Sequence, residues 1–162
     1  MPDLNFIKKL RLTGREIDSN TGVSDEYHTI SRTRAIQIDP PLSNPAVLII
    51  DDESDICYLL STILKQKDLP AVFAISLSEA NALIEQNEGL SFIFLDNYLP
   101  DGLGIDNIKQ IKKKCPLCKL IMITAHDTQS DREKAKFAGA DHFLGKPFSR
   151  EMIFKAIERL SA

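Results

Sequence analysis

The sequence predicts an α/β domain over residues 46–162, with a doubly wound, parallel sheet of five strands and with five helices. Five short apolar runs recur along this part of the chain, at residues 46–51, 71–75, 91–95, 119–124 and 141–144. Longer segments with helical spacing separate the runs, which is typical of parallel βαβ units. The runs are almost continuously apolar, as expected for a sheet that helices cover on both faces.

Each segment between the runs has the pattern of a helix. The first three segments carry apolar stripes at helical spacing. The first stripe consists of Ile56, Leu59, Leu60, Ile63 and Leu64, the second of Ala80, Leu83 and Ile84, and the third of Ile105, Ile108 and Ile111. The fourth segment is charged, and Gly139 is a good residue to end its helix. Ser149 is the expected N-cap of the last helix, whose stripe is Met152, Ile153, Ala156, Ile157 and Leu160.

Residues 1–45 differ from the rest of the chain. They hold six basic and six acidic side chains and no long periodic segment. The stretch closes with "DPPLSNP", whose three prolines favour extended or turn backbone over helix. The sequence therefore predicts an irregular N-terminal extension or linker that precedes the domain at 46–162.

The bulk composition excludes several classes of function. A net charge of −3 gives no basic field, so we expect no direct binding of nucleic acid. The longest apolar runs are about five residues, far below the ~20 that a membrane span needs. Three cysteines are an odd and sparse set, which favours a reducing, cytoplasmic location.

Polar and charged side chains stand where the predicted strands end. Asp51 and Asp52 follow the first run, Asp96 follows the third, Thr124 ends the fourth, and Lys146 follows the fifth. In an open doubly wound sheet, ligands bind at the carboxyl ends of the strands. We therefore expect these five side chains to share one pocket.

Three carboxylates and one ammonium predict a divalent cation and phosphoryl chemistry. Two like charges about 4 Å apart repel by roughly 4 kcal/mol at an effective dielectric of about 20, so protons or a dication must intervene. Oxygen ligands favour Mg²⁺, and the histidine and thiol ligands of zinc are missing from these strand ends. An aspartate beside Mg²⁺, a hydroxyl and a lysine can accept a phosphoryl group, with Asp96 as the nucleophile.

The motifs "LIIDDES", "FLDNYLPDGLG", "MITAH" and "FLGKPF" closely resemble the receiver domain of two-component response regulators. The resemblance covers residues 46–162, and its ordered set of acidic pair, acceptor aspartate, threonine and Lys-Pro is highly specific. It implies the flavodoxin-like strand order 2-1-3-4-5. It also implies a signalling domain in a phosphorelay rather than an enzyme.

The resemblance assigns the acceptor and metal roles. Asp96 would take a phosphoryl group from a histidine of a sensor kinase or phosphotransfer protein. Asp52 would ligate Mg²⁺ directly, together with Asp96, and Asp51 would ligate it or orient its waters. The backbone carbonyl of Tyr98 would be a further ligand.

The resemblance also implies a switch. Thr124 would hydrogen-bond one phosphoryl oxygen and Lys146 would pair with another, and the Lys146–Pro147 bond would be cis. Phe143 stands at the family's aromatic switch position, where its rotamer would follow Thr124. The face made by the fourth helix, fifth strand and fifth helix would then be read by a downstream protein or by a second copy of the domain. Tyr98 and His126 border the path of the attacking water and would set the lifetime of the phosphate.

Each of these residues also has a purely structural interpretation. Asp51 and Asp52 could serve only the dipole of the next helix. Lys146 could be a solvated lysine, Thr124 an ordinary strand end, and Phe143 a core residue. His126 could be a loop histidine. Cys57 is expected to pack in the first helix. "CPLC" at residues 115–118 lacks the second pair that zinc requires, and we expect no redox or metal role for it.

Three rival functions remain beside the receiver. A Mg²⁺-dependent phosphatase with an aspartyl-phosphate is disfavoured, because Tyr98 stands where such enzymes carry a second aspartate. A receiver-like interaction module that is never phosphorylated is the second rival. The third concerns output: no output domain follows the last predicted helix, so the chain is expected to be either a stand-alone receiver that acts through protein contacts or a fragment of a hybrid kinase or of a longer regulator.

Overall fold

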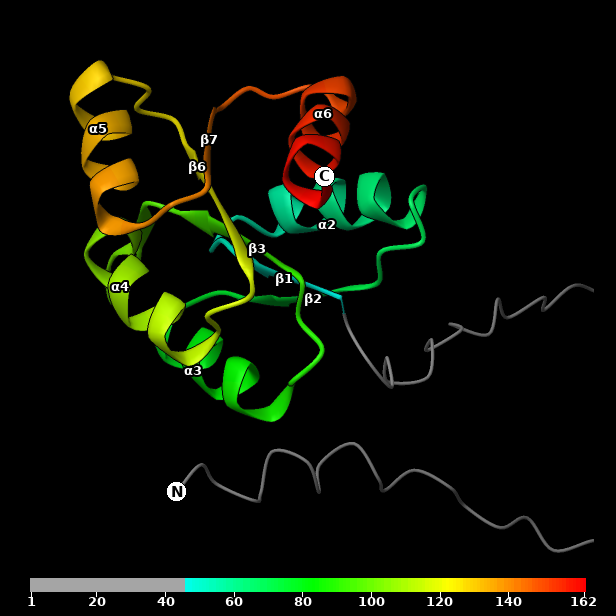
Figure 1. Ribbon diagram of the computed structural model, residues 1–162, viewed down its shortest axis with the longest axis horizontal. Helices are drawn as coiled ribbons and strands as arrows, with labels where there is room; N and C mark the ends of the chain where they lie inside the picture. The colour runs from blue at the N-terminus through cyan, green and yellow to red at the C-terminus, as the bar shows by residue number, and fades with distance from the viewer. Residues whose placement is uncertain (1–45) are drawn as a thin grey trace, which may run out of the picture. The chain divides into compact units, whose positions relative to one another are not determined.

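The computed structural model of the chain describes residues 46–162, so the extension expected at residues 1–45 lies outside the described part. A parallel five-stranded sheet forms its centre, in the order β2-β1-β3-β6-β7 (Figure 1). Its strands are β1 (Val47–Ile50), β2 (Ala71–Ala74), β3 (Phe92–Asp96), β6 (Lys119–Thr124) and β7 (His142–Gly145). The predicted fold class and strand order are confirmed.

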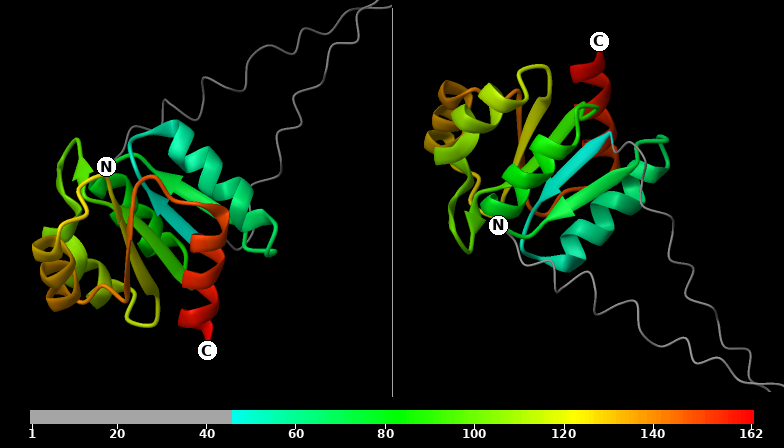
Figure 2. Two further views of the ribbon diagram at one scale, coloured as in Figure 1. Left: turned by 90° about the horizontal axis from the view of Figure 1, so that it is seen from above. Right: turned by 90° about the horizontal axis from the view of Figure 1, so that it is seen from below.

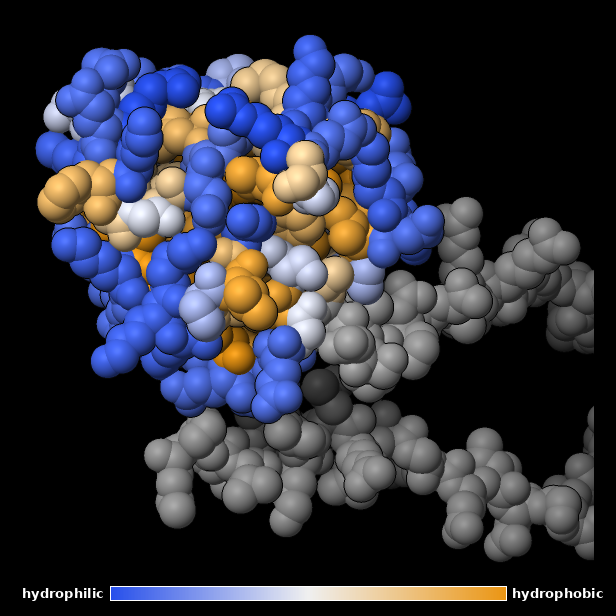
Figure 3. All heavy atoms as spheres, viewed as in Figure 1, coloured by the Kyte–Doolittle hydropathy of each residue, from blue (hydrophilic) through white to orange (hydrophobic). Residues whose placement is uncertain are grey.

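Helices cover both faces of this sheet. Helices α2 (Ser54–Lys65) and α6 (Arg150–Ser161) pack on one face. On the other face lie α3 (Leu77–Gln86), α4 (Gly104–Lys114) and α5 (Gln129–Ala138). The two views in Figure 2 show the three layers and the shared direction of the strands. Most of the surface seen in Figure 3 is hydrophilic, with apolar patches between the charged side chains.

The central strands divide the core into two clusters. Leu48 and Ile50 of β1 pack with α3 and α4, whereas Val47 and Ile49 pack with α2 and α6. All four side chains are completely buried. Because burial of one such side chain stabilises the fold by about 1.5–3 kcal/mol, β1 contributes to both halves of the core.

The edge strand β2 departs from the prediction. Its sequence is as apolar as that of the other strands, but Phe73 is 54% exposed and Ile75, just beyond its end, is 52% exposed. The reason is its place in the sheet, because an edge strand has a neighbour on one side only. Leu59 and Met152 of the predicted helical stripes are also largely exposed.

The predicted helix ends agree with the structure. The Ser149 hydroxyl accepts a hydrogen bond from the amide of Met152 at 3.3 Å and caps α6. Gly139 ends α5 with a φ of 111°, which a residue with a side chain rarely adopts. Cys57 is buried in α2, as expected. Within residues 46–162, no helix is both long and apolar enough to span a bilayer.

A short hairpin, which the periodicity did not predict, follows β3. It consists of β4 (Tyr98–Leu99) and β5 (Gly102–Leu103), which pair antiparallel across a two-residue turn. Asp101 in this turn accepts hydrogen bonds from the amides of Leu77 and Ser78, both at 2.9 Å. The hairpin therefore caps the N-terminus of α3.

Helix α4 begins directly against the end of β3. The amide of Gly104 donates to the carbonyl of Asn97 at 2.8 Å. The amide of Ile105 donates to the Asn97 side chain at 3.1 Å. A Cβ atom on Gly104 would lie 2.1 Å from the carbonyl oxygen of Asp96, so only glycine fits at this position.

We expect Asp101→Ala to lower the free energy of unfolding at pH 7 by about 1 kcal/mol, the usual value of a helix N-terminal cap. Hydrogen bonds from Leu77 and Ser78 lower the pKa of Asp101 below its ordinary value of 3.8. Its contribution is therefore complete above that value and is lost as pH falls through the pKa of the folded state. Urea unfolding of both proteins at several pH values measures the difference.

The matched control for Asp101 is Glu88→Ala. Glu88 is exposed and makes no side-chain hydrogen bond within residues 46–162. We expect this variant to unfold like the wild type at every pH. If the Asp101→Ala difference did not shrink at acid pH, the carboxylate would not be the capping group.

Candidate functional site

The predicted site residues meet at the carboxyl edge of the sheet. Strand β1 leads into Asp51, β3 ends at Asp96, and β6 ends at Thr124. Strand pairing aligns these ends, because Ile50 is opposite Leu95 and Thr124 is opposite Gly145, the residue before Lys146. The parallel register therefore brings one side chain from each of four strand ends to one pocket.

Lys146 is the centre of this pocket. Its ammonium lies 2.9 Å from Asp51 Oδ2, 3.0 Å from Asp96 Oδ1 and 2.8 Å from Glu53 Oε1. Burial disfavours the charged ammonium, but its hydrogen bonds with the three carboxylates outweigh that effect and raise the pKa of Lys146. Lys146 is thus held as a cation between the ends of β1, β3 and β7.

Asp51 is buried at the end of β1. Its Oδ1 accepts a hydrogen bond from the amide of Glu53 at 2.9 Å, while Oδ2 faces Lys146. Burial raises the pKa of Asp51, and the hydrogen bonds from Lys146 and Glu53 offset only part of that shift. Asp52, the next residue, is exposed to solvent. The acidic pair therefore presents one buried and one open carboxylate.

The carboxylate of Asp96 is held in a fixed orientation. Its Oδ2 accepts a hydrogen bond from the amide of Tyr98 at 2.7 Å, and Oδ1 faces the Lys146 ammonium. The residue is only 6% exposed. One oxygen is thus bound by the backbone and the other by a side chain.

Thr124 and the two aromatic residues lie near the mouth of the pocket. The Thr124 side-chain oxygen is buried and accepts a hydrogen bond from the amide of His126 at 3.2 Å. The rings of Tyr98 and His126 lie 5.1 Å apart between their centroids and are tilted by 59°. Tyr98 is 52% exposed. The two rings therefore form an aromatic pair at the solvent-facing side.

The predicted switch residue Phe143 lies on the same face of the sheet as Thr124. Strand pairing sets Met122 opposite Phe143 and Thr124 opposite Gly145, so the two side chains are one pleat apart. Phe143 is buried, and the Arg132 guanidinium lies 5.0 Å from its ring centroid.

Two further features surround this position. Arg132 also pairs with Asp127, and the Lys146–Pro147 peptide bond is cis, the isomer implied by the sequence. A Cβ atom on Gly145 would lie 2.7 Å from a carboxylate oxygen of Asp127, so the Asp127 side chain would have to shift to admit it. The loop after β6 is thus closely packed on the end of β7.

The donor chemistry of the site fits a hard divalent cation. Asp51, Glu53 and Asp96 supply three carboxylates that face the single ammonium of Lys146, and Asp52 supplies a fourth that is exposed beside them. In this conformation, no cluster of three acidic, histidine or cysteine side chains within residues 46–162 converges on one point. The ammonium lies between Asp51 and Asp96 and supplies the positive charge there.

Sequence reasoning missed Glu53, Asp127 and Arg132. Glu53 directly follows the acidic pair in "DDES", and this position is the signal in the sequence that could have placed it near the pocket. Asp127 and Arg132 are ordinary loop and helix residues in the sequence. The pairing of β6 with β7 brings them beside Phe143 and Gly145.

The sequence did not predict a bond between the two cysteines of "CPLC". The structure joins Cys115 and Cys118 in a disulfide, because the turn from α4 into β6 brings their Cα atoms to 5.4 Å. The pair lies at the amino ends of the strands, away from the carboxyl edge that holds Asp96.

Comparisons with known proteins identify the family of the chain. The family model of the response regulator receiver domain matches residues 47–158. The chain is 34% identical over 120 residues to the response regulator protein PilR of Pseudomonas aeruginosa, a match to 72% of this chain and 27% of PilR. It is 36% identical over 119 residues to the CpxR homolog of Haemophilus influenzae, a transcriptional regulatory protein, covering 72% of this chain and 51% of that protein.

A solved structure shows the same fold. The solution structure of the beryllofluoride-activated NtrC4 receiver domain dimer has a TM-score of 0.66 and 37% identity, and the match covers 70% of this chain and 93% of that one. The chain belongs to the response regulator receiver domain family.

Proposed function

We propose that the protein accepts a phosphoryl group on Asp96 from a histidine of a sensor kinase or phosphotransfer protein. The observation that carries the proposal is the orientation of the Asp96 carboxylate, which the Tyr98 amide and the Lys146 ammonium bind from two sides. A buried and oriented carboxylate is suited to act as a nucleophile. The phosphatase alternative has no such support, because Tyr98 stands where a second aspartate would be needed.

The transfer moves one phosphoryl group between two nucleophiles. A carboxylate oxygen of Asp96 forms the new O–P bond, and the N–P bond to the donor imidazole breaks, so the imidazole leaves with the electron pair. Lys146 then pairs with a phosphoryl oxygen, and the Thr124 hydroxyl hydrogen-bonds another. Both side chains are within the pocket before the reaction.

Mg²⁺ is the cofactor that we propose for this site. Asp51, Asp52 and Asp96, with the backbone carbonyl of Tyr98, would hold it. The excess of carboxylates over ammonium groups supports this choice, as does the oxygen-only donor set. When bound, the ion supplies positive charge to the phosphoryl oxygens.

We propose that phosphorylation of Asp96 changes the position of Thr124 and, through it, of Phe143. Phosphorylation adds about −1.5 to −2 charge beside Thr124 and Lys146 and draws both toward the phosphate. Phe143 lies one pleat from Thr124 on the same face, so a shift of the threonine changes the space available to the ring. The Arg132 side chain that covers the ring moves with it.

The surface that changes is the face of α5, β7 and α6, which corresponds to the predicted fourth helix, fifth strand and fifth helix. A hollow of about 440 Å³ lies on this face, lined by residues that include Asp127, Arg132, Phe143 and Met152. We propose that a downstream protein or a second copy of the domain reads this face. The dimer of the NtrC4 receiver supports the second possibility.

The domain boundaries and the location of the protein are also proposals. The chain covers 27% of PilR and 51% of the CpxR homolog, so their outputs do not transfer to it. We propose residues 46–162 as the receiver and residues 1–45 as an extension, in a cytoplasmic protein without direct contact to nucleic acid.

The acceptor is tested by intact mass after treatment with acetyl phosphate. We expect the wild type to gain about 80 Da, the mass of one phosphoryl group, in the presence of Mg²⁺ only. Asp96→Asn should gain nothing, because it has no carboxylate nucleophile. Asp106→Asn is the matched control, since Asp106 lies in the first turn of α4 outside the pocket. No gain in a folded wild type would favour the unphosphorylated interaction module.

The metal is tested with Lys146→Met. In EDTA we expect this variant to lose about 3 kcal/mol of stability, because Asp51 and Asp96 then lack a partner. Mg²⁺ should raise its urea midpoint more than that of the wild type, since the ion replaces the missing charge. Lys67→Met is the control, because the Lys67–Glu158 pair is exposed. An equal effect of Mg²⁺ on all three proteins would contradict the proposed metal site.

The lifetime of the phosphate is tested with Tyr98→Asn. The Tyr98 ring lies beside His126 at the mouth of the pocket, where it hinders the approach of water. A smaller side chain should therefore speed hydrolysis several-fold, as measured by the decay of the phosphorylated mass. Hydrolysis that is no faster in the variant would show that the ring does not shield the phosphate.

A further inference from the structure

The disulfide between Cys115 and Cys118 lies outside the phosphorylation site. Cys115 follows the last turn of α4, and Cys118 directly precedes β6. This places the pair at the amino ends of the strands, whereas Asp96 lies at their carboxyl ends. The family assignment and the proposed function give no role to these two sulfurs.

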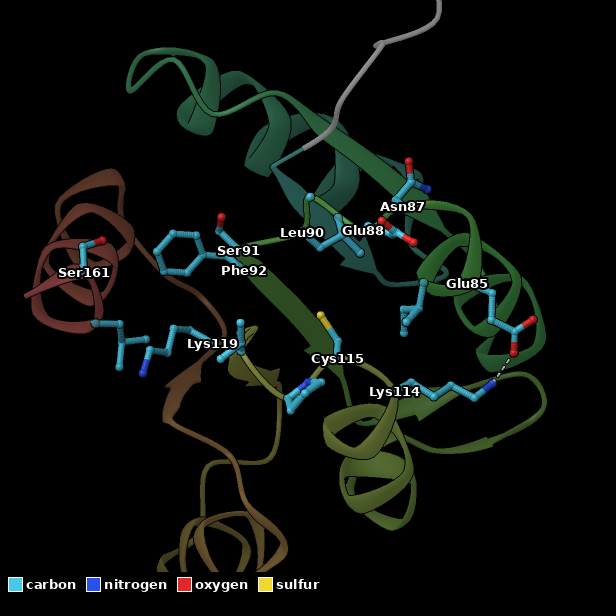
Figure 4. Close-up of a pocket in the computed structure, with 15 residues that line it drawn as sticks. Glu85, Asn87, Glu88, Leu90, Ser91, Phe92, Lys114, Cys115, Lys119 and Ser161 are labelled. Carbon is cyan, nitrogen blue, oxygen red and sulfur yellow. Dashed lines mark hydrogen bonds and ion pairs between the residues drawn. The ribbon is translucent and has the colours of Figure 1, made fainter.

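Access to the two cysteines is unequal. Cys118 is completely buried, whereas Cys115 is partly exposed. Cys115 lines a pocket of about 820 Å³, together with Leu90, Phe92, Lys114, Leu117 and Lys119. Figure 4 shows Cys115 between Lys114 and Lys119 in this pocket. Of the two cysteines, Cys115 thus lines the pocket and Cys118 does not.

The turn that carries the pair is held by hydrogen bonds other than the disulfide. The amide of Cys118 donates to the carbonyl of Cys115 at 3.2 Å, and the Cys115 amide donates to the carbonyl of Ile111 at 2.9 Å. The Lys112 ammonium binds the carbonyl of Cys118 at 2.9 Å and the carboxylate of Asp141 at 2.8 Å. These contacts keep the two cysteines adjacent when the S–S bond opens.

The reduced state also has a hydrogen-bond acceptor for its buried thiol. The Cys118 sulfur lies 3.1 Å from the carbonyl oxygen of Leu90, so a thiol at this position donates a hydrogen bond to it. A buried polar group with a partner costs little, and both redox states of Cys118 therefore fit the same surroundings.

The third cysteine provides a contrast. Cys57 is buried in α2, and its thiol lies 3.3 Å from the carbonyl oxygen of Asp51. Burial raises the pKa of Cys57 to about 11, so its reactive thiolate is scarce at neutral pH. Redox chemistry at neutral pH is thus expected from the "CPLC" pair alone among the three cysteines.

We propose that Cys115 and Cys118 form a reversible thiol–disulfide site, in which Cys115 exchanges with small-molecule disulfides and Cys118 resolves the mixed disulfide. In the oxidising direction, the Cys115 thiolate attacks a sulfur of the external disulfide and expels one thiolate. The Cys118 thiolate then attacks the Cys115 sulfur and expels the second thiolate. The protein loses two electrons and two protons, and the external disulfide becomes two thiols.

The experiment uses the full chain in buffers of reduced and oxidised glutathione. After equilibration, exchange is stopped with acid, the protein is unfolded in urea with excess N-ethylmaleimide, and the intact mass is measured. We expect three alkylated thiols in reducing buffers and one, at Cys57, in oxidising buffers, with a reversible transition between them. A pair that never oxidises, or that stays oxidised in the folded protein under excess reduced glutathione, would overturn the proposal.

Single variants test the order of attack. With oxidised glutathione, we expect Cys118→Ser to accumulate a mixed disulfide at Cys115. In Cys115→Ser the remaining thiol of the pair is the buried Cys118, so its mixed disulfide should form at least tenfold more slowly. Cys57→Ala should leave the wild-type transition unchanged. Equal adduct formation in the first two variants would refute the assigned order. The wild-type measurement does not depend on the folding of any variant, and it does not depend on phosphorylation of Asp96.

Discussion

The ammonium of Lys146 is the interaction on which the carboxyl edge of the sheet depends. Asp51 and Asp96 are buried side by side, and two such charges about 4 Å apart repel by roughly 4 kcal/mol at an effective dielectric of about 20. Lys146 contacts both at 3.0 Å or less and thereby joins the ends of β1, β3 and β7. Strands β1 and β3 are apolar and buried up to the residue before each carboxylate. The same ion pairs therefore join three strand ends and orient the Asp96 carboxylate.

Much of this arrangement could be predicted from the sequence because parallel strands share their carboxyl edge. Once five apolar runs were recognised, Asp51, Asp96, Thr124 and Lys146 had to lie together. The features that escaped depend on tertiary position rather than on local pattern. Phe73 reads as a core residue, but its strand lies at the edge of the sheet. The hairpin after β3 is too short for a periodic signal, and the Cys115–Cys118 bond depends on how closely one turn folds.

The two ends of the sheet differ in chemistry. The carboxyl edge gathers oxygen atoms and one cation around Asp96, and its partners are hard charged groups. The amino edge holds sulfur atoms beside a pocket with apolar and lysine side chains. Helix α4 begins against the backbone of Asp96 and ends at Cys115. One element of secondary structure thus touches both regions, although their reactive groups never meet.

The proposed acceptor pocket has one rigid side, at the close backbone contact of Gly104, and one side that can move. On the Gly104 side, backbone meets backbone with no space for a methyl group, and two hydrogen bonds from α4 anchor Asn97. On the Thr124 side, the walls are side chains and a loop, held by one local hydrogen bond and by the Asp127–Arg132 pair. If Asp96 carries a phosphoryl group as proposed, we expect little displacement toward α4, because that side has no free space. The displacement would then occur toward the loop after β6, so the packing on one side of the pocket would set the direction of the change.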